Sequence, residues 1–213
     1  MLTISRREQL ADRYVHYLGL VAGLIGAAAI VIAAAERGRT LAVAAVAVYG
    51  FGLICMIGAS SLYNLAKPSP RKEVFRRLDH AAIFVMIAGT YTPLTLVAMG
   101  GPSGAGIALF VWGVAGAGTA LKLIYPRRFE RLSIMLYLAL GWTILFWVRS
   151  LFDAVPASVI VLLGVGGLLY SLGVVFHLRP SWPYHNAIWH GFVLGAAACH
   201  WIAIFEGVVQ APA

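Results

Sequence analysis

The stretch LAVAAVAVYGFGLICMIGASSLYNLA, residues 41–66, runs without a single charged side chain. A helix that crosses the hydrocarbon core of a bilayer needs about 20 apolar residues, because each residue adds about 1.5 Å to a core about 30 Å thick. This stretch is therefore long enough to span a membrane as one helix.

Six further apolar runs of similar length lie on either side of this stretch. They are residues 14–35, 78–99, 104–125, 132–150, 157–178 and 184–205. Proline and glycine, which end helices, separate neighbouring runs, as in KPSP at 67–70 and GGPSG at 100–104. We therefore predict an all-α, polytopic membrane protein with seven transmembrane helices in one bundle. The connections are too short for a second folded unit, so we expect residues 1–213 to form a single domain.

The composition fits this class. Of the 213 residues, 61% are hydrophobic and 11% are charged, against about 25% charged in a soluble domain. This excludes a soluble enzyme, a disordered chain and a nucleic-acid module. The net charge of +8 comes from residues between the apolar runs, where Lys and Arg orient helices and contact anionic lipids. We expect membrane lipids as partners and no nucleic acid. Cys55 and Cys199 lie inside apolar runs and are interpreted as packing residues.

The basic residues also predict an orientation. All but three of the 16 Lys and Arg residues lie before the first run or in the second, fourth and sixth connections; the exceptions are Arg37, Arg39 and Arg149. Because Lys and Arg are enriched in cytoplasmic segments, the N-terminus should be cytoplasmic and the C-terminus outside, in a multi-pass protein of the cell membrane. The first run is longer than the h-region of about 7–15 residues in a signal peptide, so we expect it to be retained.

Polar residues inside the spans are costly, and each is therefore a functional hypothesis. The predicted orientation brings several of them to the cytoplasmic ends of four helices. They are His16, Ser60, Asn64, Asp79, His185, Asn186 and His190. Ser60 and Asn64, like Asn186 and His190, are four residues apart and share a helix face. His200 lies ten residues beyond His190 on the same predicted helix, about 15 Å deeper in the membrane. We expect a polar site at this end, with His16 and His200 as additional polar members.

Each of these residues also has a structural interpretation. Asp79 is expected in the first turn of the third helix, where its carboxylate would favour the helix dipole. The hydroxyl of Ser60 could bond to a carbonyl of its own helix. His200 could be a neutral imidazole that bridges two helices.

Three segments resemble the hemolysin III family, the bacterial members of the progestin and adipoQ receptor superfamily. They are EQLADRYVHYLG at 8–19, RLDHAAIFVMIAGTYTP at 77–93, and PYHNAIWHGFVL at 183–194 with Cys199-His200 beyond it. The resemblance implies a seven-helix membrane protein with a cytoplasmic N-terminus and a zinc ion near that side. It implies three zinc histidines, one in an S-x-x-x-H motif on the second helix and two in H-x-x-x-H on the seventh. An Asp at the start of the third helix would support a bound water. The implied reaction is hydrolysis of a lipid amide.

This sequence departs from that motif at two positions. Ser60-x-x-x-Asn64 occupies S-x-x-x-H, and Asn186-x-x-x-His190 occupies H-x-x-x-H, so two implied zinc histidines are Asn here. An amide oxygen is a weaker zinc ligand than an imidazole nitrogen, which puts zinc in doubt, and no other cofactor is expected. His185 could substitute for Asn186 if the seventh helix began irregularly. If the chain is an enzyme, Asp79 and Ser60 are the expected catalytic residues.

Four functions remain open. The double Asn favours a protein of membrane-lipid or fluidity homeostasis that has lost the metal, in which Asn64, Asn186, His190 and Asp79 form a polar network. The alternative is a metal-dependent lipid amide hydrolase, similar to ceramidases. A proton or ion pathway through His190 and His200 is a third function, although no inverted repeat supports it. Cytolysis, suggested by the family's name, is a fourth.

Overall fold

The structure is a computed structural model that describes residues 5–125 and 127–211, and every regular element in these ranges is helical. The elements are α1 (Arg6–Glu36), α2 (Thr40–Leu65), α3 (Pro70–Pro93) with the π-helical η1 (Leu94–Met99), α4 (Gly101–Ile124), α5 (Glu130–Trp142), the 3₁₀ segment η2 (Thr143–Trp147), α6 (Val148–Ala154), α7 (Ala157–His177), and α8 (His185–Ile204) with the π-helical η3 (Phe205–Val209). Seven of the helical segments are long and apolar enough to cross a membrane. This confirms the predicted all-α, seven-helix membrane fold.

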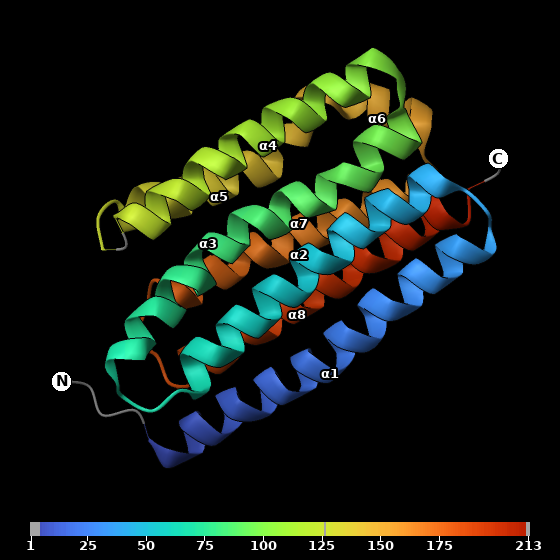
Figure 1. Ribbon diagram of the computed structural model, residues 1–213. Coiled ribbons are helices and arrows are strands. Elements are labelled where there is room, and N and C mark those ends of the chain that lie inside the picture. Colours follow the sequence, from blue (N-terminus) through green and yellow to red (C-terminus); the bar gives the residue numbers. More distant parts are fainter. Residues whose placement is uncertain (1–4, 126, 212–213) are drawn as a thin grey trace.

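The helices form one elongated bundle, in which α4 and α5 lie along one side and α1 along the other (Figure 1). The described chain ends lie at opposite ends of the bundle, as an odd number of crossings requires. In the centre, α2 and α3 approach closely because glycines face the other helix. A Cβ on Gly52 would lie 3.3 Å from Cα of Met86, and one on Gly89 would lie 3.3 Å from the carbonyl oxygen of Val48. Small residues of this kind let membrane helices pack backbone to backbone.

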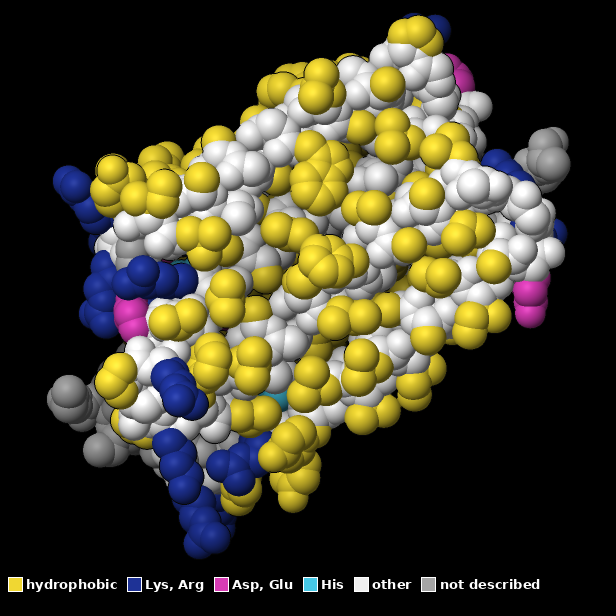
Figure 2. Space-filling model, viewed as in Figure 1, with side chains coloured by type: hydrophobic (Ala, Val, Ile, Leu, Met, Phe, Trp, Pro, Cys, Tyr) yellow, Lys and Arg dark blue, Asp and Glu magenta, His cyan; other side chains and the backbone are white. Residues whose placement is uncertain are grey.

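The surface separates into an apolar band and a basic end (Figure 2). Lys and Arg side chains gather where α1 begins, whereas hydrophobic side chains cover the length of the visible face. Many large apolar residues lie exposed on the outside of the bundle; Leu109, for example, is 76% exposed. Because such a surface is stable only in contact with lipid tails, the protein sits in the bilayer. We call the end that carries the start of α1 and the α2–α3, α4–α5 and α7–α8 connections the basic end.

Helix α3 begins at Pro70, earlier than the apolar run at 78–99 predicted. Pro70 stands in the first turn, where its fixed φ and missing N–H cost nothing, and Ser69 precedes it. The charged residues that follow continue the helix beyond the apolar part. The expectation that Asp79 lies in the first turn is therefore wrong. Asp79 lies in the third turn, too far from the helix start to act on the terminal dipole.

The fifth span is interrupted, unlike the continuous run expected at 132–150. The hydroxyl of Tyr91 accepts a hydrogen bond from the backbone N of Ile144 (2.8 Å) and lies 3.0 Å from the carbonyl oxygens of Leu140 and Gly141. The side chain of Thr143 donates to the carbonyl of Ala139 at 2.7 Å. These side chains replace regular α-helical bonds, which explains why the chain changes to the 3₁₀ segment η2 at this level.

Replacing Tyr91 by Phe should therefore destabilise the bundle. The change leaves the N–H of Ile144 and a carbonyl of α5 without this partner in a buried place, at a cost of about 1–3 kcal/mol. Unfolding of the purified protein in mixed detergent micelles measures the loss. The matched control is Tyr125→Phe at the end of α4, where the side chain is exposed and should leave the midpoint unchanged. Equal midpoints for the two variants would contradict the role given to Tyr91.

Candidate metal centre

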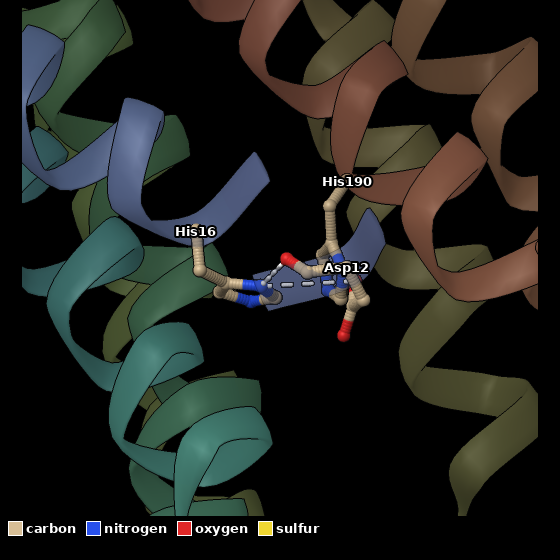
Figure 3. Close-up of side chains that lie close together, drawn as sticks. All are labelled: Asp12, His16 and His190. Carbon is tan, nitrogen blue, oxygen red and sulfur yellow. Dashed lines mark hydrogen bonds and ion pairs between the residues drawn. The ribbon is translucent and has the colours of Figure 1, made fainter. Parts of the chain in front are cut away.

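Asp12, His16 and His190 come together between α1 and α8, near the basic end (Figure 3). Asp12 and His16 are four residues apart on α1 and share one face, whereas His190 lies in the second turn of α8. Nδ1 of His190 lies 2.6 Å from Oδ1 of Asp12, and Nδ1 of His16 lies 3.7 Å from the same oxygen. The two imidazole rings meet edge to face with their centroids 4.3 Å apart. One nitrogen or oxygen from each residue lies within 4.8 Å of the other two.

All three side chains are largely removed from solvent. The side chains of His16, His190 and Asp12 are 3%, 12% and 14% exposed. Nδ1 of His16 also lies 2.8 Å from the backbone oxygen of Asp12. In such a low-dielectric place, charge-assisted interactions are stronger than they are in water, and an unpaired charge is costly. The arrangement therefore calls for a compensating positive charge, which a proton or a cation supplies.

The starts of α1 and α8 are tied together by Glu8. Its carboxylate accepts hydrogen bonds from the backbone N of Ser5 (2.7 Å) and of Tyr184 (2.8 Å). Ser5 and Glu8 form a capping box that starts α1, and Tyr184, at φ 56°, is the left-handed residue before α8. Further along, a Cβ on Gly19 would lie 2.9 Å from Leu194, so this glycine permits close packing of α1 against α8. These contacts hold the acid–histidine pair of α1 against His190.

A cavity of about 280 Å³ opens beside the centre. His16 and His190 line it, together with Ser60 of α2 and Asp79 of α3. The hydroxyl of Ser60 lies 3.3 Å from Nε2 of His16, and the Asp79 carboxyl lies against the same hydroxyl. Away from this polar end the wall is mostly apolar, with Ile83, Ile87, Leu138, Leu163, Val174 and Leu194. The cavity therefore joins a polar end to an apolar chamber inside the bundle.

Of the residues predicted from sequence, Ser60, Asp79, His190 and His16 meet at this cavity. Asn64 and Asn186 are not among the residues that line it. The amide of Asn64 donates to the carbonyl (2.9 Å) and the hydroxyl (3.4 Å) of Ser60 within α2. Asn186 lies in the first turn of α8, one turn before His190. Neither amide is therefore part of the cavity wall.

Two other histidines were also candidates. Nδ1 of His185 is buried and lacks a hydrogen-bond partner among the described residues, and this side chain is not part of the cavity wall. His200 lines the deep part of the cavity, and its Nε2 lies 3.3 Å from the carbonyl oxygen of Leu163 on α7. His200 therefore bridges α8 and α7.

Asp12 is the site residue that the sequence analysis did not select. It precedes the apolar run at 14–35 and so lay outside the predicted span, where a charged side chain is ordinary. The signal was its spacing of four residues from His16, which places both side chains on one face. The partner on α8 is 178 residues further along the chain, so only the fold brings the third member to this pair.

Two imidazoles and one carboxylate are a donor set that zinc accepts. Catalytic zinc sites commonly use three protein ligands and keep a fourth position for water or substrate. The cavity that His16 and His190 line together with Asp79 and Ser60 would leave room for such a group. The three side chains therefore fit a metal ion by their chemistry, and the open side of the centre is where a reacting group would lie.

Comparison with known proteins places the chain in a family. A family model described as "Haemolysin-III related" matches residues 5–201. The chain belongs to this family. The Hemolysin-3 homolog of Bacillus subtilis (strain 168) is 32% identical over 212 residues, covering 100% of this chain and 99% of the relative. Hemolysin-3 of Bacillus cereus is 34% identical over 192 residues, covering 90% and 88%. The human Monocyte to macrophage differentiation factor is 28% identical over 211 residues, covering 96% and 86%.

These matches confirm the resemblance drawn from the three sequence segments. The region matched by the haemolysin-III model contains Asp12, His16, Ser60, Asp79 and His190, and so includes every residue of the candidate centre and of the polar end of its cavity. The centre thus lies within the part of the chain that the family model covers.

Proposed function

We propose that this haemolysin-III-related protein is a metal-dependent hydrolase that cleaves an amide bond of a membrane lipid and so serves membrane-lipid homeostasis. One observation carries the proposal: both histidines of the Asp12–His16–His190 donor set line a mostly apolar cavity, which the carboxyl group of Asp79 also lines. A metal centre, a proton-transfer group and a chamber for an acyl chain are the parts that such a reaction needs.

Each group has a role in this proposal. Asp12, His16 and His190 hold the metal, which when bound supplies Lewis-acid polarisation of a carbonyl and a more acidic water. The Asp79 carboxylate accepts a proton from the attacking water and returns it to the leaving nitrogen. The Ser60 hydroxyl, which lies against Asp79 and His16, orients both. The apolar wall binds the acyl chain and keeps bulk water from the reacting bond.

The charge distribution supports a cytoplasmic assignment for the site. Lys and Arg gather at the basic end, where the centre lies, and such residues are retained on the cytoplasmic side (Figure 2). We accordingly propose a cell-membrane protein with its N-terminus in the cytoplasm and its C-terminus outside. We also propose that residues 1–213 form a single transmembrane domain.

A second candidate is favoured by the hydrogen bonds of the centre itself. The 2.6 Å bond between His190 and Asp12 and the 3.3 Å contact between His16 and Ser60 form a connected network without a metal. Such a network would lock α1, α2 and α8 together in a non-catalytic protein of lipid homeostasis. This is also the function that the two asparagines, Asn64 and Asn186, favoured.

Lipid hydrolysis by the purified protein distinguishes the two candidates. The protein is placed in lipid nanodiscs with a ceramide or a phosphatidylcholine, and released fatty acid is measured by mass spectrometry. We expect release from the amide lipid, loss of release after chelation, and recovery after zinc is added. No release from either lipid by zinc-loaded wild-type protein would contradict the hydrolase, and release unaffected by chelation would contradict the role of the metal.

A further inference from the structure

A second hollow, of about 320 Å³, lies at the basic end between the α2–α3 connection and the α4–α5 connection. Its wall includes Tyr63, Ser69, Lys72, Glu73, Arg76 and Arg127. None of the residues that line it also lines the cavity beside the metal centre. The hollow is therefore a separate site.

The wall carries more positive than negative charge, and its arginines are held in place. Glu73 pairs with Arg76 at 3.0 Å and with Arg127 at 3.0 Å, so one carboxylate holds two guanidinium groups at the wall. Arg76 pairs in addition with Glu130 (2.8 Å), which also pairs with Lys122. This ordering reduces the entropy that the arginines lose when they bind a ligand.

Lys72 is held in a different way. Its ammonium group donates to the carbonyl of Ala66 at 3.1 Å and stands 5.3 Å from the ring centroid of Tyr63. A carbonyl and an aromatic ring orient the ammonium group but leave its full charge in place. The hollow and the ion pairs beside it have two positive charges in excess. They hold four cations, Lys72, Arg76, Lys122 and Arg127, against two carboxylates, Glu73 and Glu130.

The position of the hollow points to the kind of anion it binds. It lies at the start of α3, whose 24 residues direct the positive end of their dipole toward Ser69 in the wall. It also lies at the basic end. Figure 2 shows Lys and Arg side chains of this end next to hydrophobic side chains of the apolar band. Guanidinium groups form paired hydrogen bonds with phosphate oxygens. Basic pockets at the cytoplasmic ends of membrane helices bind anionic headgroups.

We propose that this hollow binds the phosphate of an anionic phospholipid headgroup. Lys72 and Arg127 contact the phosphate directly, since the Arg127 side chain is 79% exposed beside its partner Glu73 and offers its remaining N–H groups to a ligand. Arg76 stands behind them and connects the hollow, through Glu130, to the wall of the metal-centre cavity, which Glu130 also lines. The site does not depend on whether the metal centre is catalytic.

Native mass spectrometry of the detergent-purified full chain tests this site. Phosphatidylglycerol and phosphatidylcholine are titrated separately, and the bound fraction of each is counted. We expect phosphatidylglycerol to be retained preferentially and the double variant K72Q/R127Q to weaken its binding by about tenfold, with phosphatidylcholine unchanged. The matched control is Arg37→Gln, an exposed cation at the opposite end, which should retain wild-type binding.

Several results would overturn the proposal. Equal retention of the two lipids, or equal loss in R37Q and in K72Q/R127Q, would show that the hollow is not the binding site. Displacement of phosphatidylglycerol by millimolar inorganic phosphate would identify free phosphate as the occupant instead of a lipid. A wild-type melting temperature for K72Q/R127Q confirms that the loss of binding does not come from unfolding.

Discussion

Replacing His190 by Ala is expected to lower the zinc content of the purified protein from about one ion per chain to near zero. The variant removes one of three ligands and leaves Asp12 and His16, two donors on one helix, which are too few for a closed tetrahedral shell. Zinc is measured by mass spectrometry after purification without a metal-affinity column.

His185 offers a matched control for this variant. It is a histidine on the same helix, five residues before His190, and it is not part of the cavity wall. We expect His185→Ala to keep wild-type zinc and His16→Ala to lose it. The opposite pattern, with zinc lost in His185→Ala and kept in His16→Ala, would assign the metal to the start of α8 and contradict the ligand set drawn here.

Replacing Asp79 by Asn is expected to lower the rate of amide hydrolysis by about 10²–10⁴-fold, the usual contribution of a general base. The amide keeps the size of the side chain and its contact with Ser60 but cannot take the proton of the attacking water. Zinc content should stay at the wild-type level, because Asp79 lies across the cavity wall and is not one of the three ligands.

The matched control for this variant is Asp153→Asn. Asp153 is an exposed carboxylate in α6, far from the basic end, and its replacement should leave both rate and zinc unchanged. An equal rate of amide hydrolysis in D79N and in the wild type would contradict a role for Asp79 in the reaction. A joint loss of zinc and activity in D79N would instead make Asp79 a ligand or a structural support for the centre.

Hydropathy was sufficient to predict the fold, because a bilayer imposes about 20 apolar residues on every crossing helix. It was less able to predict where helices begin. Helix α3 starts at Pro70 because its first turns are charged and lie outside the apolar layer, where hydropathy carries no signal. The interruption at Thr143–Trp147 depends on Tyr91, a residue 53 positions from Ile144 in the chain, and no local pattern reveals that hydrogen bond.

The candidate site could be predicted only in part. Motif positions selected Ser60, Asp79 and His190, and the cost of a buried imidazole selected His16. Asp12 was missed because it precedes the apolar run at 14–35 and so lay outside the predicted span. The two asparagines of the motifs directed attention to Asn64 and Asn186, whereas the structure brings the acid–histidine pair of α1 to His190. Which residues on different helices face each other follows from helix rotation and packing, which one sequence does not specify.

X-ray absorption at the zinc edge is the sharpest test of the metal centre, because it reports the atoms around the metal in the intact protein. We expect about one zinc ion per chain, coordinated by two imidazole rings and by oxygen, from His16, His190 and Asp12. A protein that folds without zinc, or one whose zinc has no imidazole in its shell, would contradict this metal centre and leave the connected network of Asp12, His16, Ser60 and His190 as a structural one.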